Sequence, residues 1–126
     1  MRFLSMVRVN ENAGVEVTPK LMEDMGKLMD EMTKAGILID TAGLRPTSEG
    51  KRVRLSKGIT TVSDGPFTET KEVIGGYALI ETPSMDEAIE VTKRFLHVHG
   101  DEWEVECEVR QVEAPAFDKP CGDSRA

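Results

Sequence analysis

Asp64 stands directly before Gly65 and Pro66, which makes its carboxylate the first candidate for chemistry in this sequence. A proline restricts the residue before it, and an Asp-Gly-Pro segment favours a tight turn. We therefore expect the carboxylate to be held on a stiff turn at the mouth of a sheet, where it can act as a general base or anchor a ligand. The structural alternative is that the carboxylate accepts hydrogen bonds from the backbone N–H groups of its own turn.

Three further side chains are candidates for binding a substrate beside Asp64. Lys71 and Arg110 are cations that can steady an anionic group, and Arg110 can do so with two parallel hydrogen bonds. Tyr77 follows a glycine pair and offers a hydroxyl. The alternatives are structural, because Lys71 lies among acidic residues and Arg110 continues a row of glutamates, so both can form surface ion pairs.

His97 and His99 are the only histidines of the chain. No third ligand lies at a spacing typical of a metal site, so we expect neither a metal nor another cofactor. A histidine at the end of a helix can interact with the last carbonyls of that helix. His99 can also lie on a loop that approaches the Asp64 turn, and histidine is the residue type there that is suited to proton transfer near neutral pH.

Acidic and apolar residues alternate over residues 102–110, so one face of a strand carries four glutamates: Glu102, Glu104, Glu106 and Glu108. Like charges on one face repel each other unless opposite charges or water compensate them. The basic residues at 51–57, namely Lys51, Arg52, Arg54 and Lys57, are the expected partners. A ligand or a partner surface is the alternative.

The composition limits the classes of partner. The chain has 126 residues and a net charge of −7, which opposes binding to nucleic acid or to an anionic membrane surface. Arg8 interrupts the apolar start too early for an export signal, and no apolar stretch is long enough to span a membrane. The two cysteines, Cys107 and Cys121, form no disulfide framework, and we expect free thiols in a cytoplasmic protein.

Hydrophobic periodicity predicts a helix between Thr18, its hydroxyl cap, and Ala35, followed by Gly36. Its apolar stripe, expected to be core, comprises Leu21, Met22, Met25, Leu28, Met29 and Met32. The methionines can alternatively form an adaptable binding wall. Gly26 lies beside the stripe, which suggests a close approach to a sheet.

A second helix is predicted from the capping box at 84–87 to about His97. The predicted strands are residues 2–9, 37–39, 73–80 and 102–110, with a hairpin of 52–55 and 60–62 inserted before the third. The Gly75-Gly76 pair indicates a bulge or a close backbone neighbour.

This order, β-α-β, hairpin, β-α-β, predicts an α+β fold: a ferredoxin-like βαββαβ sandwich over residues 1–113, with a loose tail at 114–126. Both helices would cover one face of the sheet. The strands at 2–9 and 73–80 carry apolar residues at both parities, so the helix-free face is expected to close against a second copy in a homodimer.

Residues 63–72 read SDGPFTETKE and are followed by IGGY at 74–77. With Gly43-Leu44-Arg45-Pro46 and Glu108-Val109-Arg110, this segment resembles the YCII-related family, in particular its DGPF branch, over residues 1 to about 113. The resemblance implies a ferredoxin-like subunit in a dimeric α/β barrel and no established reaction. The family's proposed histidine–aspartate site is not carried over, because the segment 18–35 contains no histidine.

The functional hypothesis is a small dimeric protein that binds a small organic molecule in a cleft between the Asp64 loop and the sheet, with Asp64 as a base. Lys71, Tyr77, His99 and Arg110 would contact the substrate. The rival hypothesis is a regulatory module without catalytic activity that binds a protein partner, such as a sigma factor, through the hairpin or the acidic strand.

Overall fold

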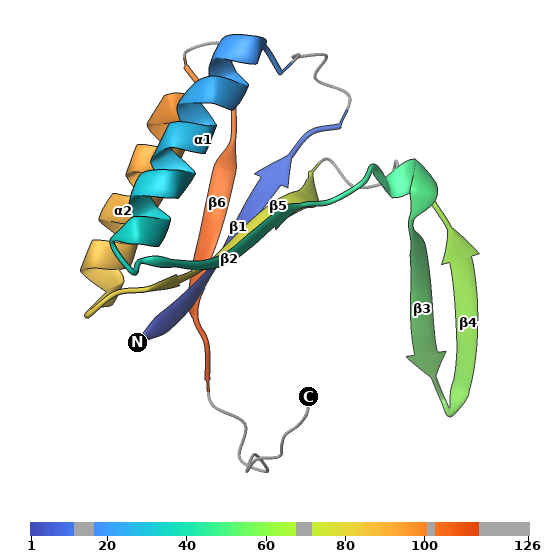
Figure 1. The fold of residues 1–126 in the computed structure, drawn as a ribbon. Coiled ribbons are helices and arrows are strands. Elements are labelled where there is room, and N and C mark those ends of the chain that lie inside the picture. Colours follow the sequence, from blue (N-terminus) through green and yellow to red (C-terminus); the bar gives the residue numbers. More distant parts are fainter. Residues whose placement is uncertain (12–16, 68–71, 101–102, 114–126) are drawn as a thin grey trace.

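A computed structural model describes residues 1–11, 17–67, 72–100 and 103–113 of the chain. The elements along the chain are β1 (Arg2–Val9), α1 (Pro19–Lys34), β2 (Leu38–Gly43), the short 3-10 helix η1 (Thr47–Glu49), β3 (Lys51–Ser56), β4 (Ile59–Asp64), β5 (Val73–Glu81), α2 (Met85–Val98) and β6 (Glu106–Gln111). Figure 1 shows α1 and α2 side by side over the sheet, and the β3–β4 hairpin standing off on the other side.

The sheet has the order β2-β5-β1-β6, and the pairs within it are antiparallel. The two strands that follow a helix, β2 and β6, are the edges, and the strands that precede the helices are in the centre. This is the arrangement of a ferredoxin-like α+β sandwich with a hairpin inserted between β2 and β5, as the sequence predicts.

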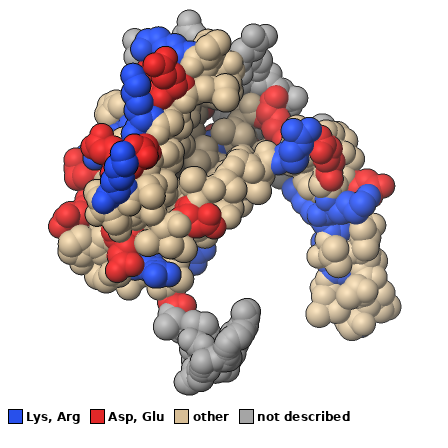
Figure 2. Space-filling view, in the orientation of Figure 1, with Lys and Arg blue, Asp and Glu red and all other residues tan. Residues whose placement is uncertain are grey.

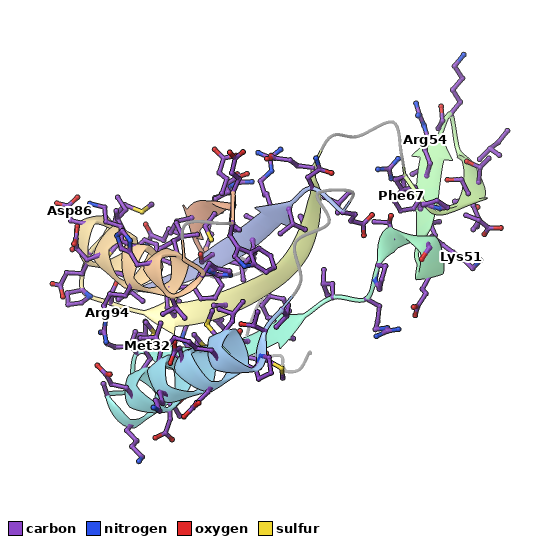
Figure 3. All side chains as sticks on the ribbon, turned by 90° about the horizontal axis from the view of Figure 1, so that it is seen from above. Met32, Lys51, Arg54, Phe67, Asp86 and Arg94 are labelled. Carbon is purple, nitrogen blue, oxygen red and sulfur yellow. The ribbon has the colours of Figure 1, made fainter. Side chains whose placement is uncertain are left out.

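Strand register separates the two faces of the sheet. Phe3 is opposite Ile80 across β1 and β5, and both are buried in the core beneath the helices. Leu4 is opposite Leu79, and because successive side chains of a strand alternate, this pair lies on the helix-free face. Figure 3 shows Met32 on the side of α1 that faces α2 and the sheet, in agreement with its exposure of 2%.

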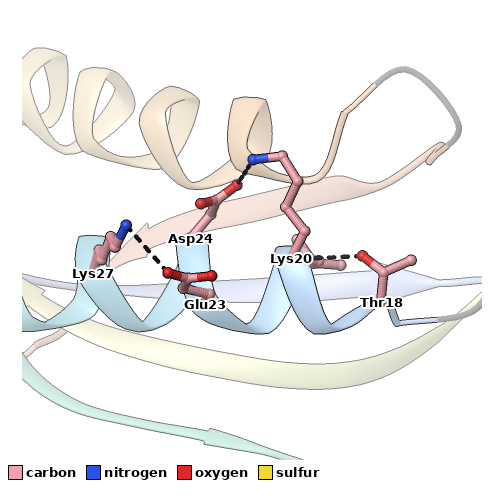
Figure 4. A network of polar contacts seen from close by, with 6 residues as sticks. Thr18, Lys20, Glu23, Asp24 and Lys27 are labelled. Carbon is pink, nitrogen blue, oxygen red and sulfur yellow. Dashed lines mark hydrogen bonds and ion pairs between the residues drawn. The ribbon is translucent and has the colours of Figure 1, made fainter.

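Helix α1 begins as predicted, with the Thr18 hydroxyl accepting a hydrogen bond from the backbone N–H of Leu21 at 3.1 Å. Its outer face carries ion pairs four residues apart, among them Lys20 with Asp24 at 2.9 Å and Lys27 with Glu23 at 3.4 Å (Figure 4). Such pairs each contribute about 0.2–0.5 kcal/mol to a helix.

Two expectations for α1 are wrong. Met22 is 67% exposed, so the buried stripe is narrower than the run of methionines suggests. A Cβ atom on Gly26 would meet no atom within 4 Å, so this glycine faces open space rather than the sheet. Both errors have the same cause, because α1 turns the face formed by Leu28 and Met32 to the core, and its flank faces solvent.

Helix α2 has the predicted cap, with the hydroxyl of Ser84 accepting a hydrogen bond from the N–H of Glu87 at 3.2 Å. The glycine pair of β5 also behaves as predicted. Val7 is opposite Gly76 and Arg8 is opposite Ile74, so Gly75 is the extra residue of a bulge. A Cβ atom on Gly76 would lie 2.9 Å from the carbonyl oxygen of Ala42, so β2 also approaches closely.

The last strand begins at Glu106, later than the predicted start at residue 102, and residues 103–105 carry no regular structure. The partner strand explains the difference. β6 pairs with β1 up to the pair Arg8–Glu106, and β1 ends at Val9, so the preceding residues have no strand beside them. The alternation of acidic and apolar residues therefore begins before the residues of β6 that pair with β1.

The β3–β4 hairpin is the predicted ribbon, with Lys57 and Gly58 at positive φ in its turn. All residues of both strands are exposed. In Figure 2 an open gap separates the hairpin from the rest of the molecule. The hairpin is therefore an arm held only at its base.

Candidate functional site

A cavity of about 380 Å³ lies between the sheet and the two helices, and we call it the helix–sheet cavity. Its wall is mostly apolar, with Met25, Met29 and Met32 from α1 and Val91 and Phe95 from α2. Its polar side chains include Ser5, Thr41, Thr92 and His99; Tyr77 also lines it, but by register the Tyr77 side chain lies with Met6 on the helix-free face. An apolar cavity with a few polar groups is typical of a binding site for a small molecule.

His99 ends α2 and lines this cavity. The backbone N–H of His99 bonds to the carbonyl of Leu96, which leaves the carbonyl of Phe95 available to the imidazole. The ring Nδ1 lies 3.1 Å from that oxygen. A carbonyl oxygen only accepts, so Nδ1 carries the proton, and in the neutral ring Nε2 presents a lone pair.

Two aromatic rings fix the orientation of the imidazole. The ring of Phe95 lies edge-on at 4.9 Å between centroids, and that of Trp103 lies at 5.4 Å. Neither aromatic residue is among the site residues that the sequence predicts. The spacing of four residues from Phe95 to His99 is a usable signal, because it places both on one face of a helix.

The two threonine hydroxyls of the cavity wall each donate a hydrogen bond to a backbone carbonyl. Thr41 Oγ1 donates to the carbonyl of Tyr77 at 2.8 Å, and Thr92 Oγ1 donates to the carbonyl of Ala88 at 2.9 Å. Each hydroxyl oxygen keeps a lone pair. Together with Nε2 of His99, they present acceptors to a ligand.

Ser5 is buried on β1, and Cys107 lies on the neighbouring strand β6. Burial raises the pKa of Cys107, the hydrogen bond from Ser5 opposes this shift, and the charge of Glu106 adds to it. Cys107 is a free thiol, as predicted. Cys121 lies outside the described residues.

Asp64 ends β4 at the base of the hairpin, where its carboxylate lies 2.6 Å from Nζ of Lys51 on β3. Both side chains are largely exposed, and Asp64 lines neither of the two cavities described here. Next to it, the N–H of Gly65 donates to the carbonyl of Gly50 at 2.9 Å. A Cβ atom on Gly65 would lie 1.6 Å from the carbonyl oxygen of Thr47, so no other residue fits here without a backbone shift.

Thr47 connects this turn to the end of β1. Its N–H and its hydroxyl both donate to the carboxylate of Glu11, at 2.8 and 2.6 Å, and its Oγ1 accepts from the N–H of Phe67 at 3.3 Å. The two hydrogen bonds to Glu11, that of the hydroxyl first, lower the pKa of this carboxyl. The segment 64–67 therefore forms the clasp that holds the hairpin to the domain. The peptide bond between Gly65 and Pro66 is cis.

A second cavity of about 480 Å³ lies between this clasp and the helix-free face of the sheet. Phe67 and Arg52 line it from the hairpin side, with the guanidinium carbon of Arg52 at 3.8 Å from the centroid of the Phe67 ring. Figure 3 shows Phe67 at the base of the hairpin and Arg54 on the arm. This cleft lies between the segment 64–67 and the sheet, but Asp64 does not line it.

The structure does not bring the predicted site residues together. His99 follows α2 and lines the helix–sheet cavity, whereas Asp64 ends β4, and the β3–β4 hairpin stands off on the other side of the sheet (Figure 1). Tyr77 donates its hydroxyl to Asp40 at 3.2 Å, and the charge of Asp40 raises the pKa of Tyr77. Arg110 is opposite Leu4 on the helix-free face and has no polar partner among the described residues. Lys71 lies outside them.

Two of the side chains expected to pair between the basic ribbon and the acidic strand pair with other residues. Glu106 pairs with Arg8 at 3.6 Å, and Lys51 pairs with Asp64. The arm stands away from β6, so the tip of the ribbon cannot compensate these glutamates within one chain (Figure 1). In the described part of the chain, no group of three or more His, Cys, Asp or Glu residues is placed to hold a metal ion.

The architecture defines a ferredoxin-like α+β protein with an apolar cavity beneath its helices. The family model of the YCII-related domain matches residues 1–107, so the chain belongs to the YCII-related family. It is similar to an uncharacterised protein, R00369, of Rhizobium meliloti (strain 1021), with 38% identity over 78 residues. The match covers 62% of this chain and 63% of that protein. No helix among the described residues is long and apolar enough to cross a membrane.

Proposed function

We propose that the protein binds a small, mainly apolar organic molecule in the helix–sheet cavity, and that His99 accepts a hydrogen bond or a proton from it. The observation that carries the proposal is the position of the imidazole, which lines an apolar cavity with Nδ1 committed to the carbonyl of Phe95. A neutral imidazole held in this way is suited to act as an acceptor or a general base.

The available acceptors also define the class of ligand. Nε2 of His99 and the lone pairs of Thr41 and Thr92 face a ligand that donates. An apolar molecule with a phenol, enol or alcohol group satisfies them, whereas a carboxylate would meet lone pairs and no donated proton from these three side chains. The ligand class is therefore an apolar hydroxyl compound.

Asp64 has a different role in this proposal. Its ion pair with Lys51 and the neighbouring contacts of Gly65 with Thr47 support a structural function in the clasp. The segment 64–67 with its flanks also supports placing the chain in the DGPF branch of the family. If Asp64 is instead a base, as the sequence suggests, the variant Asp64→Asn will lose its response to ligands.

The proposal includes a homodimer that forms over the helix-free face of the sheet. Leu4, Met6 and Leu79 are only partly buried there, and Ile74 is 49% exposed. A second copy on this face would therefore remove apolar surface from water. A cytoplasmic location is proposed as well, supported by the free thiol of Cys107. The exposed hairpin supports the rival function, an interaction with a protein.

A thermal-shift screen with mono- and bicyclic phenols tests the binding proposal, because a ligand that binds only the native state raises its melting temperature. Met25→Trp introduces a bulky ring at a residue of the cavity wall and is expected to abolish the response. Met22→Trp is the matched control, since Met22 lies on the same helix but is exposed. An equal response of both variants would place the ligand elsewhere.

A further inference from the structure

The β3–β4 hairpin exposes more apolar surface than its own chain can cover. By register, Val53, Leu55 and Val62 lie on one face of the hairpin, and they are 71%, 70% and 63% exposed. Two-stranded hairpins are marginally stable in water unless they pack against another surface. Exposed apolar side chains on such an arm therefore indicate that another surface covers the arm in the functional protein.

The charge of the arm indicates what covers it. Residues 52–63 carry three basic side chains and no acidic one, although the whole chain has a net charge of −7. The tip residues Arg54 and Lys57 form no ion pair within the described part of the chain. The sheet edge at β6 presents Glu106 and Glu108 on the helix-free face, opposite Arg8 and Met6. Arg8 and Arg110 share that face and Glu106 is paired with Arg8, so Glu108 is the acidic side chain left to meet the arm of another copy.

The helix-free face supplies an apolar counterpart for the arm. Leu4 and Met6 on β1, with Leu79 on β5, form its apolar part. The arm stands off on this side of the sheet, with open space between it and the domain (Figures 1 and 2). In a two-fold dimer, the sheets can face each other around Leu4 and Leu79 while each arm reaches the margin of the other copy's helix-free face, at Met6 and Ile74.

We infer that the hairpin is a dimerisation arm whose apolar face, Val53, Leu55 and Val62, packs on the helix-free sheet of a second copy of this chain. The inference rests on the proposed homodimer and adds the element that holds it. Lys57, in the hairpin turn, meets Glu108 on β6 of the second copy, which orients the arm. The cleft between the Phe67 clasp and the sheet is then enclosed by both copies.

Sedimentation equilibrium of the full chain and two variants tests the arm. Val53→Ser/Leu55→Ser is expected to weaken self-association by at least about a hundredfold in Kd, because two arms lose apolar contact. Ile59→Ser is the matched control: Ile59 is 66% exposed on the same hairpin but lies on its other face. Its dimer is expected to be as tight as that of the wild type.

The outcomes separate the two proposals. A dimeric wild type with an equally tight Val53→Ser/Leu55→Ser dimer overturns the arm and leaves the pairing of the sheets intact. A monomeric wild type overturns the pairing and the arm together. A chemical cross-link provides the direct check. Leu55→Cys and Met6→Cys are made separately in a chain that lacks Cys107 and Cys121, and the two proteins are mixed. A short bis-maleimide is expected to link them into a mixed dimer. If Arg45→Cys replaces Leu55→Cys and reacts equally, the contact is not specific.

Discussion

The carbonyl oxygen of Thr47 occupies the space where a side chain of Gly65 would begin, 1.6 Å from an ideal Cβ position. This contact explains the glycine of the Asp-Gly-Pro-Phe segment in steric terms. The same Thr47 binds Glu11 through its N–H and hydroxyl. The most distinctive segment of the sequence therefore holds the hairpin in place, while the cavity suited to a ligand lies on the other face of the sheet.

Gly65→Ala is expected to destabilise the hairpin base by about 1–3 kcal/mol, the usual cost of forcing an extra methyl group into a filled space. Amide hydrogen exchange at Gly65, whose N–H bonds to Gly50, measures the local loss, and urea unfolding measures the global one. Gly43→Ala is the control, because a Cβ atom there meets nothing within 4 Å. Equal exchange at the clasp in both variants would show that the contact is relieved at no cost.

Glu11 gives the clasp a dependence on pH. Its pKa is lowered in the folded protein by the hydrogen bonds from Thr47, so the carboxylate contributes stability above its ordinary pKa of about 4.3. That contribution is lost as the pH falls through the lower, folded value. The melting temperature of Glu11→Gln should therefore lie below that of the wild type at pH 7, and the difference should shrink at acid pH. Glu104→Gln, at an exposed carboxyl away from Thr47, is the matched control for the change of charge.

Cys107 is expected to react slowly with thiol reagents at neutral pH, because burial raises its pKa and the thiolate is the reactive form. In a Cys121→Ser background, labelling by a disulfide reagent should be at least about tenfold slower in the native protein than in denaturant. Ser5→Ala removes the hydrogen bond that favours the thiolate and should slow labelling further. Native labelling at the rate of the unfolded chain would contradict this account.

The sequence predicts the elements well where local signals and packing agree. Thr18, Ser84 and the Gly75-Gly76 pair each perform the predicted role, because caps and bulges depend on a few neighbouring atoms. Met22 shows the limit of the method. A stripe of apolar residues predicts which face of a helix is covered, but the width of the covered face depends on how the helix sits on its sheet.

The site is less predictable than the fold, because it depends on contacts between distant segments. Asp64 is conspicuous in the sequence, yet its carboxylate pairs with Lys51 thirteen residues earlier. The sequence allows His99 to lie near the Asp64 turn, whereas the fold places it in the wall of the helix–sheet cavity, with its ring against that of Trp103. No local sequence signal predicts that the hairpin stands away from the domain, because the direction of the hairpin depends on the contacts of the clasp at its base.

The central claim is that His99 accepts a hydrogen bond from a ligand in the helix–sheet cavity. Its most direct test is the ¹⁵N NMR spectrum of the His99 imidazole, recorded with 2-naphthol and with its methyl ether, which lacks the donated proton. The account predicts a protonated Nδ1 and an unprotonated Nε2 in the free protein at a pH where the ring is neutral, and a shift of the Nε2 signal with 2-naphthol only. Equal binding of both compounds without a shift at Nε2, or a free ring protonated at Nε2 instead, would contradict it.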